Sequence, residues 1–109
     1  MRRELEGLQV EDGERVSVEQ IPIAVTAGEL IYDNGSVQTF APDGSTRYIE
    51  AGRPTEGEWR VDEDGNFCSF WPPSYRASYD LRWIVEAGSV VGLRFSGVEG
   101  GTQFDGRYQ

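Results

Sequence analysis

The sequence predicts an all-β protein, a single antiparallel up-and-down β-barrel of about seven or eight strands with a short helical segment near the N-terminus. From about residue 36 onward, short β-prone runs follow one another with turn signals between them. In several of these runs, large apolar residues alternate with charged ones. Successive hairpins close most simply into a barrel, because closure removes exposed sheet edges. A two-sheet β-sandwich is the alternative.

The turn signals divide the second part of the chain into its expected strands. Pro42-Asp43-Gly44 has a proline preset for a turn, and Asp64-Gly65 readily supplies the positive φ of a tight hairpin. Ala87-Gly88 and the glycine-rich stretch 97–101 mark later turns. The runs between turns are the predicted strands: 36–41, 46–50, 57–62, 67–71, 79–86, 90–96 and 102–108.

The first 30 residues are less regular. Strands are expected near 8–10 and 15–18, and Ser17-x-x-Gln20 resembles a capping box that would open a helix. Pro22 and the β-branched residues around it weaken that helix, so we expect only one short helical turn. The 109 residues suit one domain, so residues 1–109 are predicted to form a single barrel, with 36–108 as a β-meander.

Alternation assigns the faces of the strands. Between residues 79 and 86 the odd-numbered positions are all apolar, and the even-numbered ones are mostly charged. The odd-numbered side chains of 79–86 and 90–96 are therefore expected to point inward. On this assignment Arg60, Arg82 and Arg94 point outward. A shift of one residue would turn them into the interior instead.

Composition excludes most side-chain chemistry. The chain has no lysine, no histidine and one cysteine, and its ten basic residues are all arginine, which stays protonated and is a poor general base. A Schiff-base lysine, a Ser–His or Cys–His pair and a histidine metal site are thereby excluded. Carboxylates remain, but no spacing brings two of them together. We expect no enzyme, no catalytic residues and no cofactor.

No metal site is expected either. The turn 62–66 is rich in oxygen ligands and could hold Ca²⁺ weakly, but it lacks the spacing of an EF-hand and suits a solvated turn better. Cys68 alone is not a zinc site, and a buried structural thiol is the expected role.

Charge and hydropathy restrict the partners and the compartment. The net charge of −9 argues against binding to nucleic acid or to anionic membranes. No apolar run reaches the roughly 20 residues of a membrane span, and no apolar stretch of a signal peptide follows Met1-Arg2-Arg3. We expect a cytoplasmic protein, with a periplasmic protein whose leader has been removed as the alternative. Arginine without lysine suggests a GC-rich bacterial genome.

Aromatic residues are the strongest candidates for function. Binding cavities are lined by such side chains with a few polar groups between them. The candidate ligand-binding residues are Phe40, Trp59, Trp71, Tyr79, Trp83 and Phe95. The expected function is a non-catalytic barrel that binds a small hydrophobic or aromatic molecule in its interior. The same rings could instead simply fill the core.

A second candidate function is a protein-interaction or enzyme-inhibitor module. The segment 71–76, with its two prolines and Tyr75, and the loop 97–101 are the protruding loops that such a module would use. A homodimer is compatible with this role.

Several motifs resemble those of small bacterial barrels of the calycin type, the lipocalin-like and streptavidin-like proteins. The motifs span roughly residues 36 to 95: Phe40-x-x-Asp43-Gly44, Gly57-x-Trp59-x-Val61-Asp62, Asp64-Gly65-x-Phe67-Cys68-x-x-Trp71 and Tyr79-Asp80-Leu81. The resemblance implies that Trp59 lies across one barrel end. It also implies that the cysteine pairs with a second one before the Tyr-Asp strand, where this chain has Ser78. The family has no established chemistry to transfer.

Overall fold

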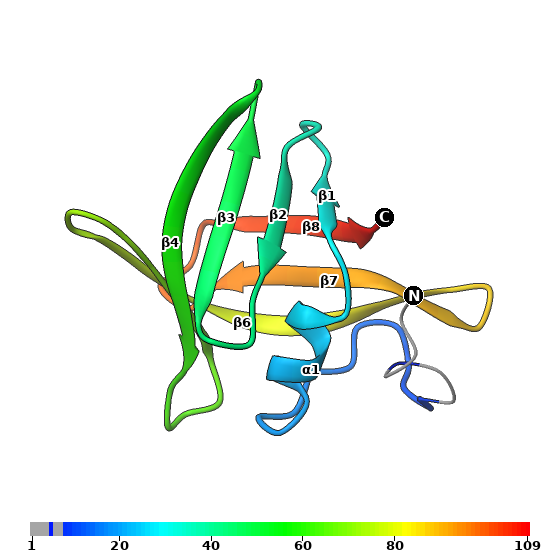
Figure 1. The fold of residues 1–109 in the computed structure, drawn as a ribbon. Helices are drawn as coiled ribbons and strands as arrows, with labels where there is room; N and C mark the ends of the chain where they lie inside the picture. The colour runs from blue at the N-terminus through cyan, green and yellow to red at the C-terminus, as the bar shows by residue number, and fades with distance from the viewer. Residues whose placement is uncertain (1–4, 6–7) are drawn as a thin grey trace.

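A computed structural model describes residue 5 and residues 8–109 of the chain, and in it eight antiparallel strands follow one another around a closed barrel (Figure 1). Each strand pairs with its neighbours in sequence. The strands are β1 Leu30–Tyr32, β2 Val37–Phe40, β3 Ser45–Glu50, β4 Arg53–Val61, β5 Phe67–Trp71, β6 Tyr75–Glu86, β7 Ser89–Gly97 and β8 Gln103–Tyr108.

The last strand closes the barrel on the first. Leu30 pairs with Tyr108, and Tyr32 pairs with Gly106. The predicted up-and-down barrel is confirmed. The alternative of a two-sheet sandwich is wrong, because pairing between β1 and β8 joins all eight strands in one sheet.

Strand β1 was missing from the sequence prediction. It has only three residues, although the turn residues Asp33, Asn34 and Gly35 follow it directly. So short a strand is stable only through its partners, and one of these lies more than 70 residues further along the chain. A pairing over such a sequence distance cannot be predicted from a local sequence pattern.

The N-terminal segment supports β6 instead of forming the strands expected for it. β6 extends beyond the end of β5, and the segment covers the edge that β5 leaves free. The Gly13 N–H donates to the Trp83 carbonyl and the Val16 N–H to the Leu81 carbonyl, both at 2.9 Å. The strand expected at 15–18 is reduced to one isolated bridge at Arg15, and the strand expected at 8–10 is wrong.

The predicted helical segment is confirmed as α1, Ile21–Thr26. Pro22 lies in its first turn, where a helix tolerates a missing N–H. One half of the expected capping box forms, since the Ser17 N–H donates to the Gln20 side chain at 3.2 Å. Ile21, Ala24 and Val25 are fully buried, so α1 closes one end of the barrel (Figure 1). No helix in the part of the chain described is long and apolar enough to cross a bilayer.

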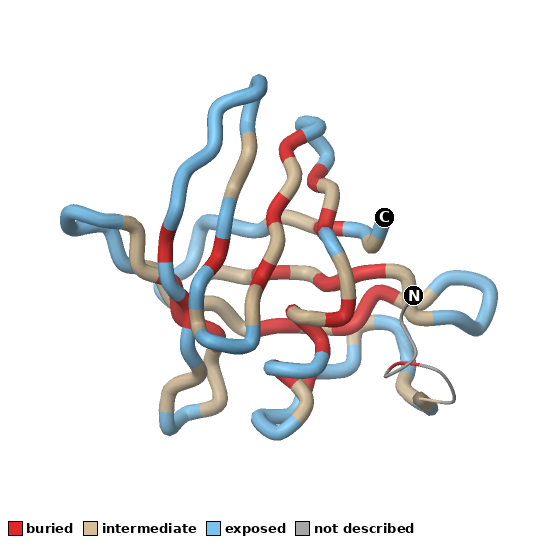
Figure 2. Tube along the Cα trace, viewed as in Figure 1, coloured by how far each residue is buried: buried red, intermediate tan, exposed pale blue. Residues whose placement is uncertain are grey.

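Burial follows the predicted faces except near the start of β7, where a bulge opposite Ile84 and Val85 makes Val90, and not the predicted Val91, the residue packed against the core. Leu81, Trp83, Leu93 and Phe95 are buried inside the barrel, whereas the tips of the hairpins are exposed (Figure 2). Leu81, Trp83 and Leu93, together with the buried face of α1, fill the end of the barrel beside the helix.

The arginines point outward as predicted and are neutralised on the outer surface. Arg82 and Arg94 lie directly opposite each other on β6 and β7, a pairing that would be repulsive by itself. Asp80 accepts 2.7 Å hydrogen bonds from both Arg15 and Arg82, and Asp105 accepts two from Arg94 at 2.8 and 3.0 Å. These ion pairs are partly exposed, so they contribute little to stability. Their main effect is to fix the positions of the side chains on the outer surface of β6, β7 and β8.

Cys68 and Ser78 are direct partners across β5 and β6. The Cys68 Sγ lies 3.2 Å from the Ser78 Oγ, and the thiol is buried. The position that the calycin resemblance assigns to a second cysteine is thus in contact with the first.

We predict that Ser78→Cys forms a disulfide with Cys68 under mild oxidation and raises the free energy of unfolding by about 2–3 kcal/mol, because it closes a short loop in the unfolded chain. Thiol titration of the denatured, oxidised protein and chemical denaturation measure both effects. Ala77→Cys is the matched control, since its side chain points to the other face of β6 and leaves two free thiols. Two reactive thiols in the oxidised Ser78→Cys protein would contradict the register.

Candidate functional site

A cavity of about 550 Å³ occupies the end of the barrel away from α1. It opens beside the β1–β2 turn and the start of β8, whereas α1 covers the opposite end (Figure 1). Seven of its lining residues are aromatic and six are polar. The lining residues are Tyr32, Asp33, Asn34, Ser36, Gln38, Tyr48, Phe67, Ser69, Trp71, Tyr79, Phe95, Gln103 and Phe104.

One wall of the cavity is a cluster of rings in mutual contact. Phe95 and Phe104 are stacked, with centroids 5.0 Å apart and an interplanar angle of 12°. Tyr32 and Tyr79 each meet Phe104 edge to face, at 5.3 and 5.4 Å. Such contacts add to the area that the rings bury and hold the wall rigid.

Phe67 divides the cavity from the filled part of the barrel. Its ring meets Phe95 at 5.7 Å on the cavity side. It also meets Phe40 at 5.7 Å and Trp59 at 6.1 Å, and neither of these two lines the cavity.

The six predicted ligand-binding residues therefore separate into two groups. Trp71, Tyr79 and Phe95 line the cavity. Phe40, Trp59 and Trp83 belong to the buried core and do not line it. The Trp59 indole N–H donates to the Ala41 carbonyl at 3.0 Å, which places this ring near the β2–β3 turn, at the α1 end.

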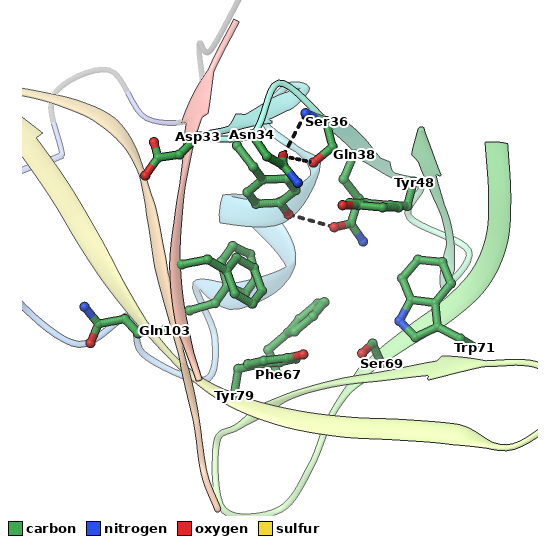
Figure 3. Close-up of a pocket in the computed structure, with 13 residues that line it drawn as sticks. Asp33, Asn34, Ser36, Gln38, Tyr48, Phe67, Ser69, Trp71, Tyr79 and Gln103 are labelled. Atoms are coloured by element: carbon green, nitrogen blue, oxygen red, sulfur yellow. Dashed lines mark hydrogen bonds between the residues drawn. The ribbon is translucent and has the colours of Figure 1, made fainter. Parts of the chain in front are cut away.

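A chain of hydrogen bonds runs behind the opposite wall. The Tyr32 hydroxyl donates to the Gln38 Oε1 at 2.7 Å (Figure 3). The Gln38 Nε2 donates to the Thr46 Oγ1 at 2.9 Å, and the Thr46 hydroxyl donates to the Thr39 carbonyl at 2.7 Å. Tyr32, Gln38 and Thr46 are all buried, so the chain is shielded from water.

Further polar atoms face the cavity without a partner among the described residues. The Ser69 hydroxyl and the Trp71 indole nitrogen are both directed toward the interior (Figure 3). Ser69 is only 6% exposed. At the mouth, the Tyr48 hydroxyl donates to the Glu50 Oε1 at 3.2 Å, and the Asn34 side chain accepts from the Ser36 N–H and hydroxyl.

Two of the lining rings lie against glycines of neighbouring strands. A Cβ at Gly57 would come within 2.5 Å of Trp71 Cε3 and 2.8 Å of the Phe70 carbonyl oxygen. A Cβ at Gly106 would come within 2.7 Å of Tyr32 Cε1. Both glycines therefore leave room for a ring that shapes the cavity.

The cavity carries no positive charge. None of the arginines that the structure describes lines it, and Asp33 is the one charged residue among the described lining residues. Burial, with smaller contributions from Tyr48 and Tyr79, raises the pKa of Tyr32 far above its ordinary value. Burial and, second, the neighbouring Tyr75 raise the pKa of Tyr79 to about 12. Both phenols are therefore neutral at physiological pH.

The carboxylates that could take part in acid–base chemistry mostly lie on the outer surface of the barrel. Asp80, Glu86 and Asp105 are each in ion pairs with arginine, and the hydrogen bonds from Arg94 lower the pKa of Asp105. The Asp62 carboxylate accepts the N–H groups of Asn66 and Asp64, as in a closed turn. Among the described residues, no three His, Cys, Asp or Glu side chains are grouped as metal ligands would be.

The sequence prediction missed Tyr32, Gln38 and Ser69. Their signal was a break in the expected alternation. Gln38 is in phase with the inward Phe40, and Ser69 lies between the inward Phe67 and Trp71. A polar residue in phase with inward rings marks a wall that is not simply packed core.

Together, the fold and the cavity define a class, small closed β-barrels with one sealed end and an aromatic cavity at the other. Comparison with known proteins finds no family model, no curated protein and no solved structure that matches the chain.

We predict that Gly57→Ala lowers the free energy of unfolding by about 1–3 kcal/mol, because the new methyl group displaces Trp71 and the β5 backbone. Chemical denaturation measures the loss. Gly97→Ala is the matched control in β7, since a Cβ there would meet nothing closer than 3.4 Å. Equal stability of Gly57→Ala and the unchanged protein would show that Trp71 does not rest on this glycine.

We also predict a loss of stability as the pH rises from about 10 to about 12. Tyr32 and Tyr79 have raised pKa values in the fold, so the unfolded chain loses these protons first. Their contribution is fully present below the ordinary tyrosine pKa and falls above it. The chain has no lysine to titrate in the same range. Urea denaturation across this range measures the slope, which Tyr79→Phe should reduce. An unchanged slope would contradict the assignment.

Proposed function

We propose that this chain is a non-catalytic barrel protein that binds a small hydrophobic or aromatic molecule in the cavity at its open end. The supporting observation is the cavity itself, about 550 Å³ with seven aromatic rings in its lining. A volume of this size is typical of sites for small organic molecules and far exceeds the roughly 30 Å³ of one water.

The contrast between the two ends of the barrel supports the same proposal. Near α1, Trp83, Leu81 and Leu93 belong to the same buried core cluster as Ile21, Ala24 and Val25 of the helix. Beyond Phe67 the barrel still presents large rings, yet a space remains between them and the wall of Gln38 and Ser69. A domain that needed these rings only as core would be expected to fill that space.

The absence of catalysis is part of the proposal. Its support is that Asp80, Glu86 and Asp105 are held in ion pairs away from the cavity. Relationship to calycin-type barrels, a bacterial source and a cytoplasmic location complete the proposal, with the periplasm as the alternative. They rest on the motifs of residues 36 to 95, the arginine-only composition and the single cysteine, which forms no internal disulfide.

A protein-interaction module is the second candidate, and two exposed side chains favour it. Tyr75 is 61% exposed and Val98 is 52% exposed, and both line one pocket on the outer surface. Tyr75 begins β6 and Val98 lies in the loop before β8, within the two segments that the sequence marked for this role. An increase in mass with concentration that Tyr75→Ser abolishes would support a dimer through this surface.

We predict that N-phenylnaphthylamine, a neutral probe that fluoresces in apolar sites, binds the protein with 1:1 stoichiometry and quenches tryptophan emission. Trp71→Phe should remove most of the quenching, because Trp71 lines the cavity. Trp59→Phe is the matched control and should keep it. Ser69→Leu should weaken binding at least about tenfold by filling the cavity, at little cost in stability. Absence of binding to the folded, unchanged protein would refute the proposed function.

A further inference from the structure

We infer that the cavity selects an uncharged aromatic molecule that carries a hydrogen-bond acceptor, such as a carbonyl, on one edge. This inference rests on the proposed function and specifies its ligand class. It follows from the direction of the buried hydrogen bonds, the unpartnered polar atoms beside them, and the charges at the cavity.

The direction of the hydrogen-bond chain is fixed by its last acceptor. The Thr39 carbonyl can only accept, so the hydroxyl proton of Thr46 points to it. The Thr46 oxygen must then accept from Gln38, which places the amide nitrogen of Gln38 toward Thr46 and its oxygen toward Tyr32. Tyr32 in turn must donate its proton to that oxygen. A reversed amide would set two acceptors, the Gln38 oxygen and the Thr46 oxygen, against each other with no proton between them.

This fixed direction determines what the wall offers to a ligand. Tyr32 takes one of the two lone pairs of the Gln38 Oε1, whereas the second N–H of its amide has no acceptor among the described residues. The Trp71 indole N–H is likewise a donor without an acceptor, and it can only donate. Gln38, Ser69 and Trp71 share one side of the cavity (Figure 3). That side therefore presents an excess of donors.

The opposite wall suits a flat apolar ring. Phe95 and Phe104 present a stacked pair there, bordered by Tyr32 and Tyr79. A ligand with an aromatic face on one side and an acceptor on the other would satisfy both walls at once.

Charge excludes an anionic acceptor. Within residues 8–109, no arginine lines the cavity to neutralise a carboxylate or phosphate, and Asp33 lines its mouth. Glu50 lies beside the Tyr48 hydroxyl, and the whole chain carries a net charge of −9. An anion entering the cavity would lose its hydration without gaining a counter-charge. A neutral carbonyl meets no such cost.

Three competitors of similar size test the inference by displacing N-phenylnaphthylamine. Methyl naphthoate has the ring and a neutral carbonyl, isopropylnaphthalene has the ring without an acceptor, and naphthoate has the ring with a negative charge. We expect methyl naphthoate to bind about tenfold more tightly than isopropylnaphthalene, the effect of about one hydrogen bond. We expect naphthoate to bind at least about tenfold more weakly than the ester.

A variant outside the cavity tests the direction of the chain. Thr46 is buried but does not line the cavity, so Thr46→Val removes the acceptor that orients Gln38 and leaves the cavity shape unchanged. The preference for the ester over isopropylnaphthalene should fall to about twofold or less, while the affinity for isopropylnaphthalene stays the same. Thr46→Ser should restore the preference. Thr39→Val is the matched control, because it keeps the Thr39 carbonyl.

The two proposals fail in different ways. If N-phenylnaphthylamine does not bind, the proposed function fails. If it binds but naphthoate displaces it as well as the ester does, or isopropylnaphthalene matches the ester, the ligand class inferred here is overturned and the binding role stands. An ester preference that survives Thr46→Val would overturn the orienting role of Thr46.

Discussion

Closure of the barrel between β1 and β8 is the constraint on which the rest of the structure depends. Only three residue pairs form this junction, yet they fix the number of strands and so the width of the interior. An eight-stranded barrel has room for either packed side chains or one small molecule. This chain does both: the helical end is filled, and the other end keeps a cavity. Phe67 lies at the boundary between the filled end and the cavity.

The cavity is shaped as much by small residues as by large ones. Trp71 and Tyr32 can approach the sheet closely because glycines lie beneath them, and these two rings carry or adjoin the polar atoms of the cavity. Thr46 and Thr39 then set the orientation of Gln38 from behind. The polar wall of the cavity is thus held in place by residues that do not line it. Preorganisation of this kind lowers the conformational cost of binding.

Much of the fold could be predicted from sequence because its signals are local. The hairpin turns at Asp43-Gly44 and Asp64-Gly65 and the alternation in β6 and β7 need only neighbouring residues to be recognised. Strand β1 and the attachment of residues 13–16 to β6 depend on partners far along the chain, so no local pattern showed them.

For the same reason, only part of the site could be predicted. Aromatic residues stand out in any sequence, but whether a ring lines a cavity, as Trp71 does, or fills a core, as Trp83 does, depends on depth along the barrel axis. Gln38 and Ser69 would be found by the opposite reasoning. A polar residue on the inward face of a strand indicates a cavity wall.

The seal that α1 forms at one end has a kinetic consequence. Ile21, Ala24 and Val25 are fully buried at that end, so a molecule bound as proposed would enter and leave through the open end. Affinity and residence time are then set by different parts of the protein. For such a ligand the walls, Trp71 included, would determine how strongly it is held, and the exposed β1–β2 turn around Asp33 would determine how quickly it escapes. Changes confined to that turn would alter the rates of exchange of a neutral ligand in both directions and leave its binding equilibrium unchanged.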